Sequence, residues 1–170
     1  MRKSWREKLD NANGLPKVMA IPPKMRNRWG TGTLVIPAPR EVDAVMKKVP
    51  AGKLITINEI RTIIAQMHQA TIACPITTGI FAWIAAHAAE EARAAGAKRM
   101  TPYWRTLKSN GQLNPRYPGG LARLRELLRR EGHRLTAKGK GWFVVDYEDS
   151  LWPSAKQSRL SGLASQRRAT

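Results

Sequence analysis

The sequence offers few side chains that could carry covalent or metal chemistry. It has one cysteine, Cys74, which stands before Pro75 in an apolar stretch, and three histidines, His68, His87 and His133. A single thiol excludes an internal disulfide and any zinc site built from several cysteines. The histidines lack metal-ligand spacing, and no phosphate loop of the Walker type is present. We therefore expect no metal and no other cofactor, and we interpret Cys74 as a buried structural thiol.

The charge of the chain indicates a polyanionic partner. The 170 residues carry 30 Lys and Arg against 12 Asp and Glu, which gives a formal net charge of +18 and a sequence pI near 11.1. An excess of this size disfavours the compact state unless a polyanion neutralises it. Twelve basic residues stand against two acidic ones in residues 98–141, whereas residues 34–97 are nearly neutral. We expect a nucleic-acid-binding face in the first segment and a core-forming unit in the second.

The neutral segment contains two helical patterns separated by a break. Thr56 and Glu59 are spaced as a capping box, which opens a helix after a short β-branched stretch. The buried stripe of this helix is expected to contain Ile57, Ile60, Ile63, Ile64 and Met67. After the break at residues 68–74, Thr77 or Thr78 is expected to cap a long helix that reaches about Ala95. Helix, break and helix form a helix-turn-helix pattern.

Residues 69–89 contain no charged side chain, which is also a property of membrane spans. Pro75, Gly79, the polar threonines and the many alanines make a span a poor interpretation. We expect a buried helix instead. The basic N-terminus has no apolar core of signal-peptide length, so a cytoplasmic protein is the expectation.

Further elements are indicated on both sides of this pair. A short amphipathic helix is bounded by Pro39 and Pro50. Downstream, residues 103–107 are expected to form a short strand, followed by a turn at residues 109–111. Gly119 and Gly120 open another helix, which ends at residues 131–132. Residues 141–147 are expected to pair with residues 134–136 as a hairpin.

The local motifs follow one another in a recognisable order. They are Gly52-Lys53-x-x-Thr56, the helix pair, Pro102-x-x-Arg105, Asn110-Gly111, Tyr117-x-Gly119-Gly120-Leu121 and Leu127-Leu128-x-x-Glu131-Gly132. With these motifs, residues 41–134 resemble the DNA-binding, active-site domain of alkylguanine-DNA alkyltransferases and the related alkyltransferase-like proteins. The resemblance implies a winged helix-turn-helix that enters the minor groove of DNA and flips a guanine into a pocket.

The resemblance also implies which chemistry is missing. The enzymes of that family transfer the alkyl group to the cysteine of a Pro-Cys-His-Arg motif, and this chain has Pro102-Tyr103-Trp104-Arg105 there. A thiolate nucleophile needs a sulfur with an activating neighbour, and neither Tyr nor Trp supplies one. We therefore expect no catalytic residue and no alkyl transfer at this position.

The resemblance assigns roles to several other side chains. Trp83 stands where the family has an arginine finger, so it is either a stacking wedge or a core residue. Tyr103, Trp104, Tyr117 and Glu131 are expected to form the base pocket, although ordinary packing of the aromatic residues and an ion pair of Glu131 are the alternatives. The residues expected to contact DNA are Lys53, Thr77, Thr78, Gly79, Trp83, Arg105, Lys108, Arg116 and Arg123.

These observations predict a mainly α protein with short β elements. A basic N-terminal extension (1–37) precedes a winged helix-turn-helix domain (38–135), and a β element with a basic tail follows (136–170). The expected function is non-catalytic binding of duplex DNA, with recognition of alkylated guanine for repair and repair proteins as further partners. Two rivals remain: an alkyl-accepting protein that uses Cys74, and an architectural or regulatory DNA binder that recognises no lesion. The expected location is the cytoplasm, in association with the nucleoid and not with a membrane.

Overall fold

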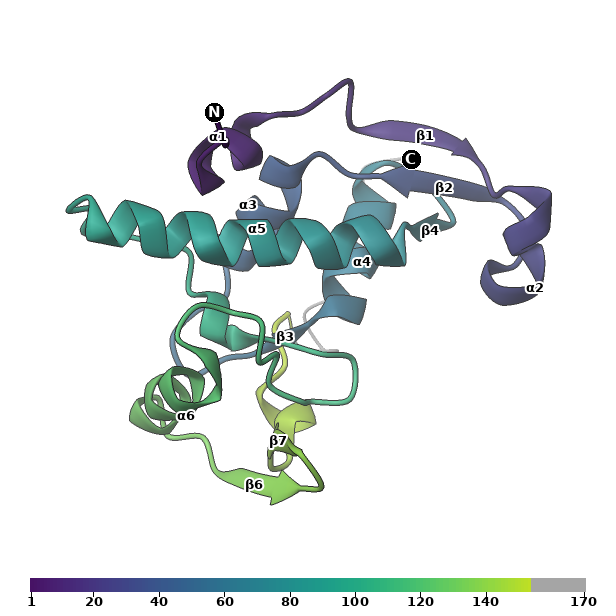
Figure 1. Cartoon of the computed structure of the whole chain (residues 1–170). Coiled ribbons are helices and arrows are strands. Elements are labelled where there is room, and N and C mark those ends of the chain that lie inside the picture. Colours follow the sequence, from purple (N-terminus) through teal and green to yellow (C-terminus); the bar gives the residue numbers. More distant parts are fainter. Residues whose placement is uncertain (154–170) are drawn as a thin grey trace, which may run out of the picture.

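A long helix, α5 (Pro75–Ala94), is the axis of the fold. The structure is a computed structural model, and it describes residues 1–153. Three helices pack against α5: α1 (Trp5–Asp10), α3 (Pro39–Lys47) and α4 (Ile57–Met67) (Figure 1). In the same view, α6 (Gly120–Arg130) and the C-terminal strands lie on the other side of α5 from α1.

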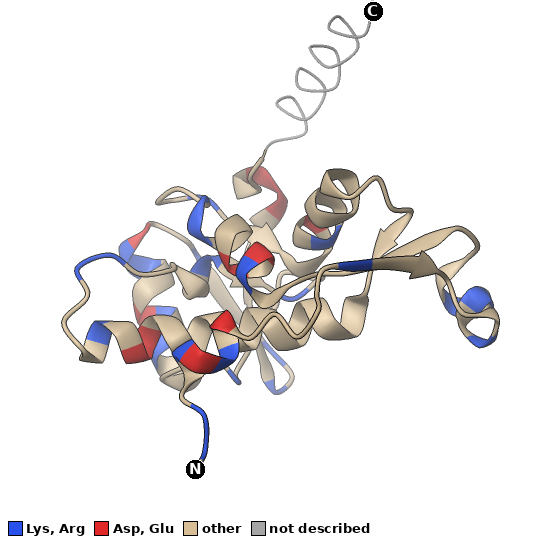
Figure 2. Cartoon of the chain, turned by 90° about the horizontal axis from the view of Figure 1, so that it is seen from above, with Lys and Arg blue, Asp and Glu red and all other residues tan. Residues whose placement is uncertain are grey.

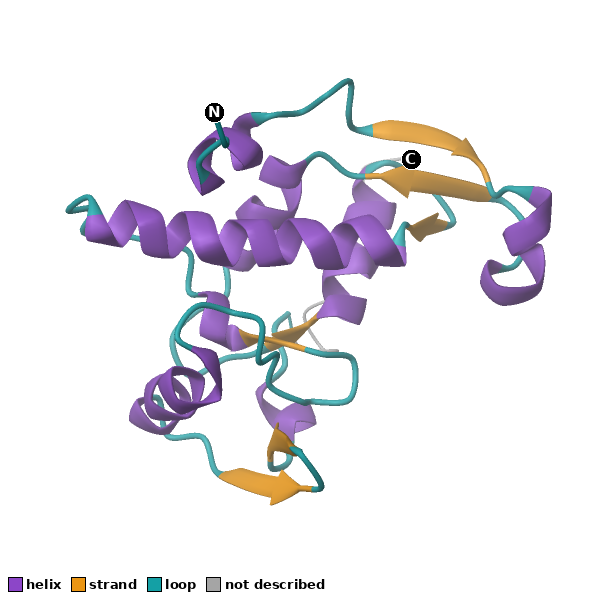
Figure 3. Ribbon diagram, in the orientation of Figure 1, coloured by secondary structure: helices purple, strands orange, loops and turns teal. Residues whose placement is uncertain are grey.

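Within residues 1–153 the strands are short and belong to three small sheets (Figure 3). In the first sheet, β2 (Thr33–Ile36) pairs antiparallel with β1 (Lys17–Ala20) and parallel with β4 (Ile72–Ala73). The second sheet joins β3 (Ile55–Thr56) to β5 (Thr106–Leu107) in parallel. In the third, β6 (Leu135–Lys138) and β7 (Gly141–Val144) form an antiparallel hairpin. The fold is therefore mixed α/β, with more strand pairing than a mainly α chain would have.

The remaining elements are single turns of helix. The segment between β1 and β2 contains a 3₁₀ turn (Pro23–Met25) and the short helix α2 (Arg26–Trp29). Two further 3₁₀ turns lie at Tyr103–Arg105 and Tyr147–Ser150.

The main core lies between α3, α4 and α5 and continues under α6. Its fully buried side chains include Met46, Ile60 and Leu128, and alanines supply most of the buried face of α5. A second, smaller core contains Ile21 and Leu34 from the first sheet together with Cys74. Within residues 1–153, no helix has both the length and the apolar character needed to cross a membrane.

Most of the expected local elements are confirmed. The carboxylate of Glu59 accepts a hydrogen bond from the backbone N–H of Thr56 at 2.9 Å, so α4 begins where the capping pattern placed it. α3 begins at Pro39, α6 ends just before residues 131–132, and the hairpin of residues 135–138 and 141–144 is present. These elements depend on contacts between residues close in sequence, which is why local patterns identified them.

Two details of the helix pair were wrong. Met67 is 58% exposed and does not belong to the buried stripe of α4. α5 begins at Pro75, with Cys74 at the N-cap position, so neither threonine caps the helix. The Thr78 hydroxyl instead donates to the Cys74 carbonyl at 2.7 Å, one turn back along the helix. Proline is well suited to the first helical position because it has no N–H to leave unpaired there.

The N-terminal segment packs on the rest of the molecule, which the expectation of an extension over residues 1–37 did not include. The backbone N–H groups of Trp5 and Arg6 donate to Glu91 on α5, and Leu9 is buried in the main core. β2 belongs to the same segment, and it pairs with β4, the strand that directly precedes α5 in the sequence. The basic tail expected after the β element falls in residues 154–170, outside the described residues.

Candidate nucleic-acid interface

A groove with a volume of about 960 Å³ runs between α5 and the loop that follows β5. The exposed side of α5 forms one wall, and residues 108–116 form the other. The lining residues are Ile76, Gly79, Ile80, Trp83 and His87 from α5, and Lys108, Asn114, Pro115 and Arg116 from the loop. Gly79, Trp83, Lys108 and Arg116 were all expected to contact DNA from sequence, and the fold brings these four together.

The helical wall of the groove is apolar although it faces solvent. Ile76 and Ile80 are 60% and 46% exposed, and they stand one helical turn apart. The opposite side of α5 is buried through Ala82, Ala85 and Ala89. An exposed apolar stripe on a helix that already buries its other side is a candidate interaction surface. Sequence reasoning missed both isoleucines because α5 is apolar on every side, so periodicity could not separate its exposed face.

Trp83 lies at one end of the groove in an aromatic cluster. Its ring meets Trp5 of α1 edge-on with centroids 4.7 Å apart, and Trp5 stacks on His87 at 4.4 Å. Trp83 is half-buried and packs on the main core, so it is neither a free wedge nor a fully buried core residue. The His87 imidazole also lies 3.2 Å from the Arg116 carbonyl oxygen, which ties the loop to the helix.

Two cations stand on the loop side of the groove. Lys108 and Arg116 are exposed, and neither forms an ion pair with a carboxylate in residues 1–153. Unpaired cations beside an apolar wall combine groups that can bind phosphate with a surface that can contact a base. Thr77 is half-buried, and its hydroxyl is shielded from solvent without a hydrogen-bond partner. Thr78 is completely buried, so its side chain is not part of this surface.

The aromatic base pocket expected from sequence is not an open site. Tyr103 and Tyr117 are only 1% and 3% exposed, and their rings meet edge-on with centroids 6.1 Å apart in the main core. Burial raises the pKa of Tyr103 to about 12, assisted by Glu90, whose carboxylate accepts from its hydroxyl at 3.3 Å. Burial also raises the pKa of Tyr117. The two side chains therefore belong to the packed interior, which was the alternative interpretation.

Arg105 and Glu131 form an internal ion pair. The Arg105 Nε lies 2.9 Å from the Glu131 Oε1, and a second guanidinium nitrogen contacts the same oxygen. The third nitrogen donates to the Val49 carbonyl at 2.7 Å. Both side chains are largely buried, and each guanidinium nitrogen of Arg105 already has an internal acceptor. The pair joins the turn at residues 103–105 to α6 and to the end of α3.

One expected base-pocket residue, Trp104, and two expected DNA-contact residues, Lys53 and Arg123, lie outside the groove. Trp104 is half-buried in a separate groove of about 610 Å³, beside Lys47, Lys98 and Arg99. Lys53 is exposed just before β3. Arg123 on α6 is paired with Glu126 at 3.1 Å.

Cys74 is buried at the foot of α5. Its backbone N–H donates to the Val35 carbonyl at 2.9 Å, and its side chain belongs to the second core. This placement agrees with the interpretation of Cys74 as a structural thiol. In the part of the chain that the structure describes, no group of three or more metal-ligating side chains is present.

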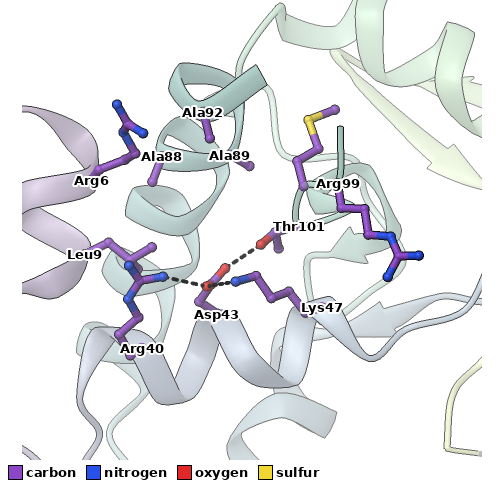
Figure 4. Close-up of a pocket in the computed structure, with 11 residues that line it drawn as sticks. Arg6, Leu9, Arg40, Asp43, Lys47, Ala88, Ala89, Ala92, Arg99 and Thr101 are labelled. Atoms are coloured by element: carbon purple, nitrogen blue, oxygen red, sulfur yellow. Dashed lines mark hydrogen bonds and ion pairs between the residues drawn. The ribbon is translucent and has the colours of Figure 1, made fainter. Parts of the chain in front are cut away.

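A smaller cavity of about 90 Å³ lies between α1, α3 and α5, and Figure 4 shows the residues around it. Its centre is the buried carboxylate of Asp43, which accepts from the Thr101 hydroxyl at 2.5 Å. Lys47 and Arg40 approach the same carboxylate at 3.0 and 3.5 Å. Because its partners already satisfy the carboxylate, we interpret this cluster as a structural link between α3 and residues 99–101.

The comparisons with known proteins give structural similarity only. No protein-family model and no curated protein sequence matches the chain. Among solved structures, the chain is similar to S. pombe Atl1 in complex with damaged DNA containing O6-carboxymethylguanine, at 18% identity and a TM-score of 0.46. It is also similar to S. pombe ATL in complex with DNA, at 17% identity and a TM-score of 0.47. Each similarity covers 67% of this chain and 93% of the other.

Proposed function

We propose that this chain is a non-catalytic DNA-binding protein that recognises alkylated guanine in duplex DNA for repair. The observation that carries the proposal is the groove between α5 and residues 108–116, in which exposed Ile76 and Ile80 face a loop with two unpaired cations. The formal net charge of +18 supplies the long-range attraction that such binding needs.

The two walls of the groove suit different parts of DNA. Lys108 and Arg116 neutralise phosphates, which positions the protein on the duplex without reading sequence. The apolar face of α5 provides contact area for an alkyl group, whose burial contributes roughly 0.8 kcal/mol per methylene. An alkylated guanine also pairs more weakly than a normal one, so extruding it from the stack costs less. Both effects favour the damaged base in the same groove.

The burial of Tyr103 and Cys74, together with the residue type at position 103, supports the proposal that this chain transfers no alkyl group. Tyr103, at the position where the resembling enzymes have their acceptor cysteine, is in the core and carries no sulfur. Cys74 is buried in the second core at the foot of α5 and does not line the groove. A nucleophilic thiol must reach its substrate, and Cys74 is shielded from one.

The proposal is tested with two matched duplexes that differ by a single O6-alkylated guanine. Fluorescence anisotropy at fixed salt should give a preference for the damaged duplex on the order of tenfold, which corresponds to about 1.4 kcal/mol. The intact mass of the protein should be unchanged after incubation, with the lesion still in the DNA. Equal affinity for the two duplexes would favour the architectural rival, and an alkyl adduct on Cys74 would favour the alkyl-accepting rival.

Substitutions in the groove locate the binding surface. Ile80→Asp places a negative charge on the exposed face of α5 and should weaken duplex binding at least tenfold. Met67→Asp is the matched control, because Met67 is also apolar and exposed, at 58% against 46% for Ile80, but does not line the groove. Equal losses in the two variants would show that only net charge matters.

The lesion preference itself is tested at two tryptophans. Trp83→Ala should remove most of the preference for the damaged duplex, whereas Trp104→Ala should retain it because Trp104 lies in a different groove. Thermal melting of both variants checks that they are folded. The reverse pattern would place the base near Trp104 and would contradict the proposed site.

A further inference from the structure

The segment of residues 17–36 forms a basic arm, made of β1, β2 and the turn of helix between them. Residues 11–40 contain five basic side chains and no acidic one. Lys24, Arg26 and Arg28 are exposed at the tip of the arm, and none has a carboxylate partner among the described residues. Figure 2 shows the tip as a basic projection at one end of the molecule. Three unpaired cations this close in sequence repel one another, and an anionic partner would relieve that repulsion.

The tip is a packed element with a fixed position. Met25 and Trp29 pack against the second core of Ile21, Leu34 and Cys74. The packing of Met25 and Trp29 holds the backbone of the tip in place, while the side chains of Lys24, Arg26 and Arg28 extend into solvent.

The root of the arm is also held tightly. The hydroxyl of Thr71 accepts from the Thr33 backbone N–H at 3.0 Å, and the hydroxyl of Thr33 accepts from the Thr71 backbone N–H at 3.1 Å. Gly32 has a φ of 119°, and a Cβ there would collide with the Thr71 side chain. A glycine is required at this close approach, which fixes the turn between the tip and β2.

The arm lies beside the first turn of α5. Leu34 and Val35 of β2 pair with Ile72 and Ala73 of β4, directly before the helix. Cys74, the N-cap residue of α5, contributes its side chain to the core under the tip. In Figure 1 the short helix α2 lies beyond β4, at the end of α5 where the helix begins. The basic tip therefore stands at the Ile76 end of the groove, opposite the end that Trp83 and His87 occupy.

We propose that the tip of this arm is a second contact with the same DNA duplex. Lys24, Arg26 and Arg28 bind backbone phosphates next to the site held by α5 and residues 108–116. This inference rests on the proposed function, because it requires a duplex in the groove. The arm adds affinity without adding lesion preference, since phosphate contacts carry no information about the base.

Charge favours DNA over the other anionic partners. The three cations are not accompanied by exposed aromatic residues at the tip, because Trp29 is half-buried in the second core. A membrane-binding tip usually places such rings on the lipid side. Acidic proteins are less densely charged than a DNA backbone, which carries one charge about every 1.7 Å of duplex.

The salt dependence of duplex binding tests the proposal. The triple variant K24A/R26A/R28A removes three phosphate contacts, so the slope of log K against log salt concentration should become shallower by about 2.7. Between about 50 and 200 mM salt, the wild type should then lose roughly fortyfold more affinity than the variant. The triple variant R2A/K3A/K48A is the control, because it removes the same charge from exposed sites outside both the arm and residues 98–141. An equal change in both variants, or none in the tip variant, would overturn the assignment.

The same measurement separates this inference from the proposed function. The tip variant should keep the preference for alkylated guanine while it loses affinity for both duplexes in parallel. If the wild type shows the preference and the tip variant keeps the wild-type slope, the arm contact is wrong and the groove assignment stands. If the wild type shows no preference but the slope changes as expected, the arm binds DNA and lesion recognition fails.

Cross-linking places the tip on the DNA directly. Asn27→Cys carries a photo-reactive label at the tip, and Ala44→Cys carries the same label at an exposed position of α3. Buried Cys74 should take up no label, which the unsubstituted chain verifies. Label at residue 27 should cross-link to duplex, and label at residue 44 should not. Transfer of label 27 to anionic lipid vesicles but not to duplex would contradict the proposal.

Discussion

The ion pair between Arg105 and Glu131 should be a determinant of stability and not of DNA binding. The Arg105 guanidinium reaches both oxygens of Glu131, at 2.9 and 3.1 Å from Nε, and the Val49 carbonyl at 2.7 Å. The two side chains are 14% and 13% exposed. Arg105→Leu leaves Glu131 as a shielded carboxylate without its partner, and it also leaves the Val49 carbonyl unpaired.

The expected cost follows from that shielding. Removal of one partner from a buried ion pair costs about 3–5 kcal/mol, whereas an exposed pair contributes about 0–1 kcal/mol. Because some solvent reaches this pair, we expect about 3 kcal/mol. For a chain of 150–250 residues, each kcal/mol lowers Tm by roughly 2–4 °C, so the variant should melt roughly 6–12 °C below the wild type.

A double-mutant cycle provides the assay. Urea unfolding is measured for the wild type, Arg105→Leu, Glu131→Leu and the double variant. The double variant should be more stable than the sum of the single losses predicts, because it leaves no charge without a partner. Duplex affinity at a temperature where all variants are folded should change less than threefold. A variant of normal stability that has lost most of its DNA affinity would refute the structural role and restore Arg105 as a phosphate contact.

Three further predictions follow from burial. Converting Tyr103 to Cys and Trp104 to His recreates the acceptor motif of the alkyltransferases that this chain resembles. Because position 103 is in the core, the intact mass of this variant should show no alkyl adduct after incubation with alkylated duplex. An adduct would show that the segment opens. Burial lowers the pKa of His133, so the folded state disfavours its charged form. The free energy of unfolding should therefore fall as the pH drops below about 6.5, where the unfolded chain takes up the proton. In urea titrations between about pH 7 and 5, His133→Leu should make this dependence of stability on pH weaker. Trp5→Ala removes two aromatic contacts on α5 and should cost about 1–3 kcal/mol in urea unfolding, and an unchanged midpoint would mean that α1 is not held there.

The elements that the sequence predicted are those defined by neighbouring residues. The Thr56 and Glu59 capping pattern, the proline at the start of α3 and the glycine after α6 each act within one turn of the backbone. The exposed face of α5 was less accessible to prediction. A helix that is apolar on all sides has no periodic hydrophobic pattern. The exposure of Ile76 and Ile80 is therefore determined by where the other helices pack against α5.

In the candidate site, too, the sequence indicated residue types better than it indicated where the side chains lie. The resemblance assigned Tyr103, Tyr117, Arg105 and Glu131 to a base pocket and its surroundings, but motif spacing does not state which side of a turn faces the core. The charge pattern could have predicted that Glu131 forms an ion pair. Residues 98–141 contain two acidic residues against twelve basic ones, so each carboxylate has several cations with which it can pair. Glu131 pairs with Arg105, and Glu126 pairs with Arg123 and Arg130.

The arm could not be predicted because its order depends on partners distant in sequence. Thr33 and Thr71 exchange hydrogen bonds across 38 residues, and the core under the tip combines Ile21 with Cys74. The only cysteine thus acts as a packing group between the N-terminal strands and the first residue of α5. A change there should move the arm and the groove relative to each other. Cys74→Leu, which overfills the second core, should lower duplex affinity through the arm while Cys74→Ala retains more of it, and similar affinity in both variants would show that the two DNA contacts are independent.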